Sequence, residues 1–288
     1  MGIYEEQLKR VKYVTLKDGA KIAYEEFGSG DKYILSTHMT HNPVQYVNML
    51  GDYGYHVIHM WNRSSGPSDP DSKDFTPHWY DRWADDVVEV ADALGIDKFI
   101  YSGASHGAGT GWHVLWRHKE RVKAFIALVA GPHPLDGNAS NFRDMVDKNP
   151  NIDFMNYPTD DAAALARRAS ADAYGKETRK YQSSYNYGKP MYELGTEEKL
   201  IELLKTFDVP TLLMGGIEDM IAQPNYMLRT AKALPQCKFM LYSHVAHSGL
   251  INELLEETVE QSLIFLKNLE ENDGRIYKKI DLSYDPMK

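Results

Sequence analysis

The stretch Gly103-Ala104-Ser105-His106-Gly107 decides the fold, because it fits the pattern G-x-S-x-G and has informative flanks. Residues 98–102 before it are apolar and aromatic, which is typical of a buried strand. Residues 108–118 after it have their large apolar side chains at helical spacing. A serine between such a strand and helix is predicted to occupy a strained tight turn, a nucleophile elbow. Its two glycines are expected because a Cβ at either position would collide with a neighbouring strand or helix.

The length and composition of the chain limit the classes of protein to which it can belong. The chain has 288 residues, enough for one large domain or a domain with an insertion. Its net charge of −9 and the lack of a basic stripe argue against a nucleic-acid partner. The single cysteine, Cys237, cannot form an internal disulfide and suits a reducing compartment. Residues 1–17 lack the apolar core of a signal peptide, and no run reaches the roughly 20 apolar residues of a membrane helix. We therefore expect a cytoplasmic protein without a membrane partner.

Strand and helix patterns alternate over most of the chain. Strands are predicted at 11–16, 21–27, 33–37, 56–60, 98–102, 124–129, 210–214 and 238–242. Helices are predicted at 44–53, 79–94, 108–118, 196–207, 224–234 and 250–269. Such alternation predicts an α/β fold with a mostly parallel eight-stranded sheet and helices on both faces.

The alternation stops between Pro132 and Thr196, which predicts an insertion. We expect a core domain made of residues 1–132 and 196–288 and a helical cap made of residues 133–195. The cap should contain short helices, such as 159–174, above the carboxyl ends of the strands, where α/β sheets place their sites. Its many tyrosines suit an aromatic-walled pocket, and Tyr185 and Tyr187 are predicted substrate contacts.

The whole pattern resembles the α/β-hydrolase superfamily, and the likeness covers nearly the whole chain. It includes the first hairpin, the polar loop after the third strand, the elbow after the fifth, and the inserted cap. Asp219 follows a strand in Gly216-Ile217-Glu218-Asp219, as the family's acid does, with Glu218 as the alternative. His247 follows the last strand, as the family's histidine does, with His244 as the alternative. The chain order Ser, Asp, His is also the order of the family.

The resemblance and the residue types together imply roles for these side chains. Ser105 would be the nucleophile and His247 its base, with Asp219 holding the imidazole in the right tautomer. The oxyanion would accept hydrogen bonds from the backbone N–H of His106 and of Thr40, with Met39 as the alternative to Thr40.

Two departures from the family pattern concern the loop after the third strand and the residue after the serine. The loop begins His38-Met39, where the family commonly has His-Gly, and both residues are predicted substrate contacts. The sequence Ser-His-Gly at the elbow is similar to that of the cofactor-independent dioxygenases of the same fold.

The leading functional prediction is a serine hydrolase that cleaves a small or medium carboxylic ester or lactone through an acyl-enzyme. The same triad could instead serve C–C bond hydrolysis or cofactor-independent oxygenation, and a hydrolase-like small-molecule receptor is the third interpretation. No cofactor is expected. No metal is expected either, because the histidines in 38–41 and 56–59 lack clustered cysteine or carboxylate partners. The partner would be a small organic substrate, and a homodimer is left open.

Overall fold

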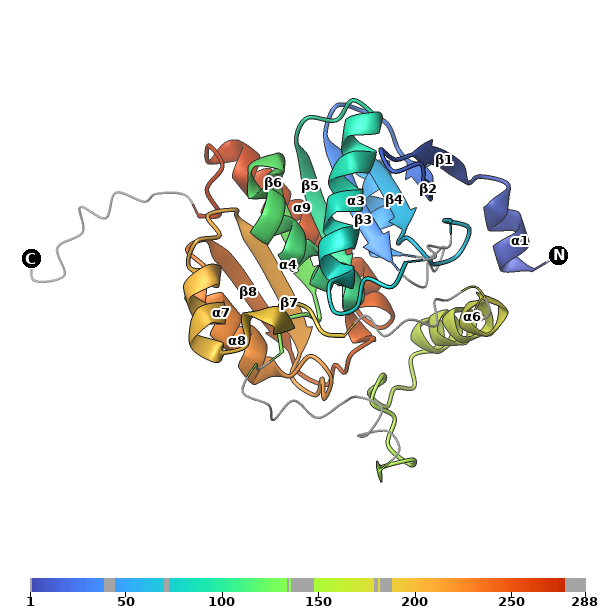
Figure 1. The fold of residues 1–288 in the computed structure, drawn as a ribbon. Coiled ribbons are helices and arrows are strands. Elements are labelled where there is room, and N and C mark those ends of the chain that lie inside the picture. Colours follow the sequence, from blue (N-terminus) through green and yellow to red (C-terminus); the bar gives the residue numbers. More distant parts are fainter. Residues whose placement is uncertain are drawn as a thin grey trace, which may run out of the picture.

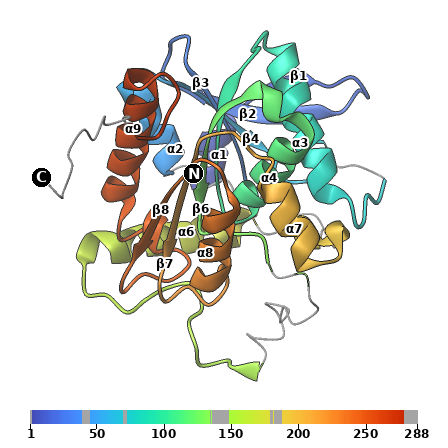
Figure 2. The same cartoon turned by 90° about the vertical axis from the view of Figure 1, so that its left-hand side faces the viewer.

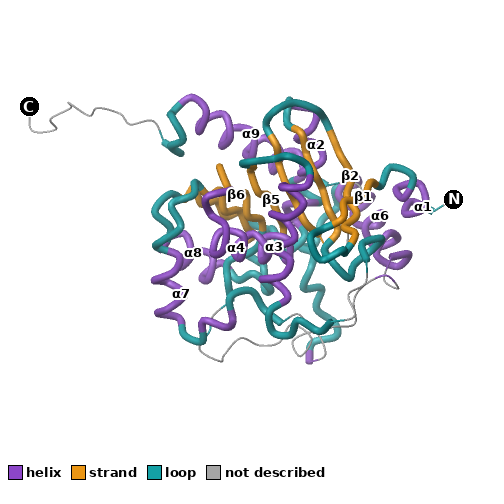
Figure 3. Tube along the Cα trace, turned by 45° about the horizontal axis from the view of Figure 1, so that its top comes forward, coloured by secondary structure: helices purple, strands orange, loops and turns teal. Residues whose placement is uncertain are grey.

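An eight-stranded sheet runs through the middle of the molecule, between two layers of helices (Figure 1, Figure 3). The computed structural model describes residues 2–37, the backbone of residue 38, and residues 45–69, 73–133, 135, 148–178, 181 and 188–277. The strand order is β1-β2-β4-β3-β5-β6-β7-β8. β2 pairs antiparallel with both of its neighbours, and the pairs from β4 to β8 are all parallel. The predicted mostly parallel eight-stranded sheet is confirmed.

The strands lie within a few residues of their predicted positions. They are β1 Lys12–Thr15, β2 Lys21–Phe27, β3 Tyr33–His38, β4 His56–Trp61, β5 Phe99–Ala104, β6 Val122–Leu128, β7 Thr211–Gly216 and β8 Cys237–Tyr242. The helices are α1 Ile3–Leu8, α2 Tyr46–Met49, α3 Trp79–Ala93, α4 His106–His118, α6 Ala162–Thr178, α7 Glu197–Leu204, α8 Pro224–Ala233 and α9 Leu255–Glu271. None of these described helices is long and apolar enough to cross a membrane.

The two faces of the sheet bury different helices. One core cluster joins the sheet to α3, α4, α7 and α8, and the other joins it to α2 and α9 (Figure 2). Neighbouring strand residues alternate between the clusters, as Leu212 and Leu213 of β7 do, because successive side chains point to opposite faces. The predicted placement of helices on both faces is confirmed.

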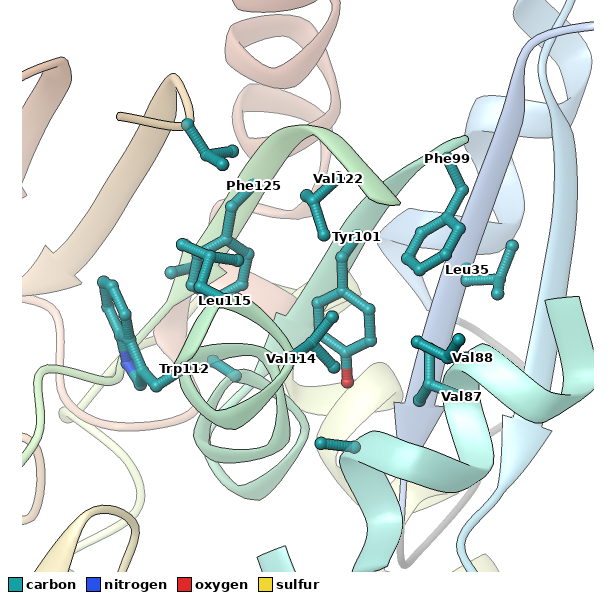
Figure 4. Packing of buried hydrophobic residues seen from close by; sticks show 14 of the residues in the cluster. Leu35, Val87, Val88, Phe99, Tyr101, Trp112, Val114, Leu115, Val122 and Phe125 are labelled. Atoms are coloured by element: carbon teal, nitrogen blue, oxygen red, sulfur yellow. The ribbon is translucent and has the colours of Figure 1, made fainter. Parts of the chain in front are cut away.

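Helix α4 packs close to the sheet because its inner side carries small residues. A Cβ at Gly111 would lie 2.5 Å from the ring of Phe125 and 2.7 Å from that of Tyr101. Trp112 fills the space beside this contact, and its ring meets that of Phe125 edge-on at 4.8 Å (Figure 4). The close packing fixes the distance between the sheet and the first turn of α4, which begins directly after Ser105.

Three segments differ from the sequence-based expectation. Residues 44–53 were predicted as one helix, but the described part is the short α2 followed by a 3₁₀ turn that ends at left-handed Gly54. The final helix begins at Leu255 and not at residue 250, because a 3₁₀ turn at 249–251 precedes it. Helix α1 was not predicted, since its six residues, Ile-Tyr-Glu-Glu-Gln-Leu, are too few to show a helical period.

Helix α1 joins the predicted cap to the sheet. The hydroxyl of Tyr174 in α6 donates to Oε1 of Gln7 at 2.6 Å, and Nε2 of Gln7 donates to Glu25 of β2 at 2.8 Å. All three side chains are buried, and Tyr4 packs edge-on against Tyr174. The C-terminal half of α6 is therefore tied through α1 to β2, the second strand of the sheet.

Candidate active site

Ser105 lies in a strained turn between β5 and α4. Its φ of 51° and ψ of −116° are unfavourable for a residue with a Cβ, a strain of about 1–3 kcal/mol. Its N–H donates to the carbonyl of Leu128 on β6 at 2.9 Å, which holds the turn against the sheet. A Cβ at Gly103 would lie 2.4 Å from the backbone of Gly107, and one at Gly107 would lie 2.4 Å from the carbonyl oxygen of Thr37. The turn closes only because both positions are glycine.

Buried hydroxyls support the turn from below. The hydroxyl of Tyr101 donates to the carbonyl of Gly107 at 2.8 Å and lies 2.9 Å from the hydroxyl of Thr37. Thr37 is the penultimate residue of β3, so the end of that strand packs directly against the turn. The end of β3 therefore lies beside the turn that carries Ser105.

Ser105, His247 and Asp219 form a row of hydrogen bonds although they are far apart in sequence. The distance from Ser105 Oγ to His247 Nε2 is 2.9 Å, and that from His247 Nδ1 to Asp219 Oδ2 is also 2.9 Å. The other oxygen of Asp219 accepts the N–H groups of Ile221 and Ala222 at 2.8 Å each. A carboxylate only accepts, so Nδ1–H of His247 donates to Asp219 and leaves Nε2 as the acceptor for the serine hydroxyl.

The two alternative residues have other contacts. The carboxylate of Glu218 accepts the N–H of Val245 at 3.0 Å and thus braces the loop that carries His247. His244 is exposed, and its Nδ1 lies 3.0 Å from the hydroxyl of Tyr157. Neither contacts the row, so the geometry favours Asp219 and His247 over Glu218 and His244.

Several predicted site residues lie outside the described part of the chain. They are the side chain of His38 and the whole of Met39, Thr40, Tyr185 and Tyr187. Their contacts therefore remain predictions. The N–H of His106 belongs to the first turn of α4, whose N–H groups have no acceptor within the helix and point toward the serine end.

Comparison with known proteins identifies the family. Residues 37–254, about three quarters of the chain, match the alpha/beta hydrolase fold family. The chain belongs to this family. A bifunctional esterase/perhydrolase from Acinetobacter calcoaceticus is 28% identical over 131 residues, which span 43% of this chain and 45% of that relative. The match thus covers less than half the length of the curated relative.

Solved structures share the fold of this family over nearly their whole length. A meta-cleavage product hydrolase from Pseudomonas fluorescens IP01 has a TM-score of 0.67 and 21% identity, covering 91% of this chain and 99% of its own. An N-acyl homoserine lactone degrading enzyme has a TM-score of 0.67 and 21% identity, covering 88% and 100%. An epoxide hydrolase from Vigna radiata has a TM-score of 0.65 and 14% identity, covering 91% and 99%. At these identities the likeness shows the fold alone.

The side chain of His106 has contacts that the sequence did not predict. Its Nδ1 lies 2.5 Å from the hydroxyl of Tyr80 on α3, and the two rings stack at 6.2 Å. The ring of His113, also on α4, stacks on that of Tyr80 at 5.5 Å. His113 Nε2 accepts the N–H of Met191, so α4 also holds the chain where it returns from the predicted cap. No local pattern relates positions 80, 106, 113 and 191, so the sequence offered no signal for this network.

Two further imidazoles near His247 are kept neutral. Burial lowers the pKa of His106 to about 4, and the positive charges of His247 and His133 act in the same direction. Burial likewise lowers the pKa of His133 to about 4, assisted by Lys189 and His247. At neutral pH both rings are therefore uncharged. Each can donate or accept a hydrogen bond beside the hydrogen-bonded series of Asp219, His247 and Ser105.

Acid should destabilise the protein through these two rings before its carboxylates titrate. An unfolded histidine takes up a proton near its ordinary pKa of about 6.5, whereas the folded rings resist protonation down to about pH 4. The unfolded state therefore binds more protons between these values, so stability falls as the pH drops through this window. We expect each ring to cost about 1–2 kcal/mol of unfolding free energy between pH 7.5 and 5.

Urea unfolding at the two pH values measures this loss. His133→Gln should remove about half of it, while His78→Gln, at an exposed histidine, should leave it unchanged. An equal loss in wild type and His133→Gln would contradict the assignment.

The described residues that could together hold a metal ion are His78, Asp81 and Glu193. Their ligand atoms lie within 4.8 Å of one another at the surface. Asp81 already accepts a hydrogen bond from Nδ1 of buried His113 at 2.8 Å. Of the histidines in 56–59, His59 Nδ1 bonds the side chain of Asn48, and His56 stacks on Tyr33.

Proposed function

We propose that this chain is a serine hydrolase that cleaves a small or medium carboxylic ester or lactone through an acyl-enzyme. The observation that carries the proposal is the continuous row from Asp219 through His247 to Ser105 at a strained turn. A general base within hydrogen-bond reach, itself oriented by a carboxylate, is what a serine hydroxyl needs to become a nucleophile. The partial match to a bifunctional esterase/perhydrolase supports the ester class.

The chemistry follows from the positions of the protons. Ser105 Oγ attacks the substrate carbonyl while Nε2 of His247 takes the hydroxyl proton. The same nitrogen then gives that proton to the departing alkoxide, which leaves as an alcohol and forms the acyl-enzyme. Water repeats the sequence, with His247 again as base, and releases the acid. Asp219 keeps Nδ1 protonated and stabilises the imidazolium that forms in both halves.

The negative charge that develops on the carbonyl oxygen needs fixed donors. We assign one to the backbone N–H of His106, at the start of α4, where the positive end of the helix dipole adds to the hydrogen bond. The second donor is proposed to come from the loop after β3, from Thr40 or Met39, because β3 ends against the elbow at Thr37. The cap, residues 133–195, is proposed to select the substrate.

Turnover of p-nitrophenyl esters of graded chain length, together with simple lactones, tests this function. We expect release of p-nitrophenol that Ser105→Ala abolishes, and labelling by a fluorophosphonate probe at Ser105 in wild type only. Absence of turnover with intact labelling would point to other chemistry at the same serine, for which oxygen consumption is the next measurement. Absence of both would favour a receptor.

A further inference from the structure

We propose that Arg168 of α6 is a positioning residue that holds, through Glu253, the loop that carries His247. The loop meant here, the histidine loop, comprises residues 243–254 and joins β8 to α9. The proposal rests on the proposed hydrolase function for its kinetic consequences, while the contact itself is structural. It gives the predicted cap a part in positioning the base, in addition to the selection of substrate proposed above.

The ion pair between Arg168 and Glu253 links the predicted cap to the core and is mostly buried. The guanidinium of Arg168 pairs with the carboxylate of Glu253, and the two side chains are only 15% and 14% exposed. A carboxylate this far out of water is stable only with a partner, so Arg168 fixes where Glu253 can lie. The guanidinium end of the pair has a further hydrogen bond, to the chain before α6.

Glu253 lies against the part of the histidine loop next to the base. Its Oε2 would be 3.6 Å from a Cβ at Gly249, two residues beyond His247. The N–H of Leu254 donates to the carbonyl of Gly249 at 2.9 Å, which closes the loop on itself. Because Leu254 follows Glu253 directly in the chain, a displacement of Glu253 disturbs this hydrogen bond to Gly249, two residues beyond His247.

Arg168 is held by the chain before α6 and by α6 itself. Its Nη2 donates to the carbonyl of Tyr157 at 2.6 Å, and the hydroxyl of Tyr157 lies 3.0 Å from Nδ1 of His244. Two residues earlier, the carbonyl of Met155 accepts the N–H of Ser248 at 2.7 Å. The segment 155–157 thus lies between Arg168 and the histidine loop and contacts both.

The rest of α6 is fixed by contacts at both of its ends, so the helix holds Arg168 in one position. Arg167 Nε donates to the carbonyl of Asn252, in the same loop, at 2.5 Å. At the other end, Tyr174 is tied through Gln7 to Glu25 on β2. α6 is therefore fixed to the histidine loop at one end and, through α1, to β2 at the other.

The experiment removes the charge of Arg168 and measures both rate and loop motion. Arg168→Met should lower kcat for a small p-nitrophenyl ester about 10- to 100-fold, because a base misplaced by about 1 Å loses that much. KM should change less than twofold, since Arg168 acts on the base and not on the ester. Arg168→Lys should recover part of kcat. Hydrogen exchange of the amides at 245–251 should quicken in Arg168→Met, while that of β5 stays as in wild type.

A double-mutant cycle shows whether the effect passes through Glu253. Glu253→Gln and the double variant Arg168→Met/Glu253→Gln should each lose about as much kcat as Arg168→Met, because the residues act as one unit. Arg117→Met, which removes an arginine–carboxylate pair between α3 and α4, is the matched control and should leave kcat within twofold.

Other results would overturn the proposal. Additive losses, a change confined to KM, or unaltered exchange at 245–251 would each show that Arg168 does not position the loop. If wild type turns over no ester, the proposed function fails, but hydrogen exchange still decides whether Arg168 holds the histidine loop.

Discussion

Ser105→Ala is expected to lower kcat for ester hydrolysis by about 10⁵-fold, and His247→Ala by a similar factor. The reason is that Oγ of Ser105 and Nε2 of His247 share one hydrogen bond of 2.9 Å, so each group is ineffective without the other. The double variant should consequently be little worse than either single one, although two independent losses of this size would multiply. Burst-phase and steady-state kinetics on one p-nitrophenyl ester, with circular dichroism to confirm folding, measure all three variants.

His244→Ala is the matched control, because it removes an imidazole from the same loop. His244 is exposed and contacts Tyr157, so its loss should change kcat less than about fivefold by a small displacement of the loop. A larger loss in His244→Ala than in His247→Ala would reverse the assignment of the base. Multiplicative losses in the double variant would show that Ser105 and His247 do not act together.

The sequence predicted those parts of the fold that depend on a local pattern. Buried parallel strands such as β5, β6 and β7 are short apolar runs, and the sheet places them within a few residues of the prediction. The elbow is equally local, because Gly103 and Gly107 are required by contacts within a single strand–turn–helix unit. Asp219 and His247 could be proposed because each follows a strand as the acid and the histidine of the α/β-hydrolase superfamily do.

Parts of the structure that depend on long-range contacts could not be predicted. Helix α1 is too short and too charged to be recognised alone, and its buried face is completed by Tyr174, far along the chain. The pairing of Arg168 with Glu253 has the same character, because an arginine and a glutamate in polar segments look like surface residues. Tyr80 was expected only as part of a helix, and its contact with His106 depends on how α3 packs beside α4.

Arg63 is the clearest example of a charged residue that lies in a polar stretch of sequence but is buried by long-range contacts. Its neighbours in sequence, 62–68, predicted only a loop rich in turn formers, yet its side chain is 2% exposed. Its guanidinium donates to both oxygens of Asp86 on α3, at 3.0 and 2.8 Å, and to Asp18 in the turn between β1 and β2 at 2.7 Å. The loop it leads into reaches the predicted cap, where the N–H of Gly66 donates to the carbonyl of Tyr181. Arg63 thus ties the first hairpin and α3 to a loop that contacts the cap.

Arg63→Met should therefore destabilise the fold by about 3–5 kcal/mol, because it leaves the carboxylate of Asp86 buried with one of its two arginine partners gone. For a chain of this size we expect a fall in Tm of roughly 5–8 °C. The double variant Arg63→Met/Asp86→Leu should recover most of the loss, since an apolar pair of similar volume needs no counter-charge.

Arg117→Met is the matched control. It removes a similar two-pronged contact with Asp85, but here the arginine is 37% exposed, so the change should cost less than about 1 kcal/mol. Urea and thermal unfolding compare the four proteins. Equal costs for Arg63→Met and Arg117→Met, or a double variant less stable than Arg63→Met alone, would show that burial of the Arg63–Asp86 pair does not govern its contribution.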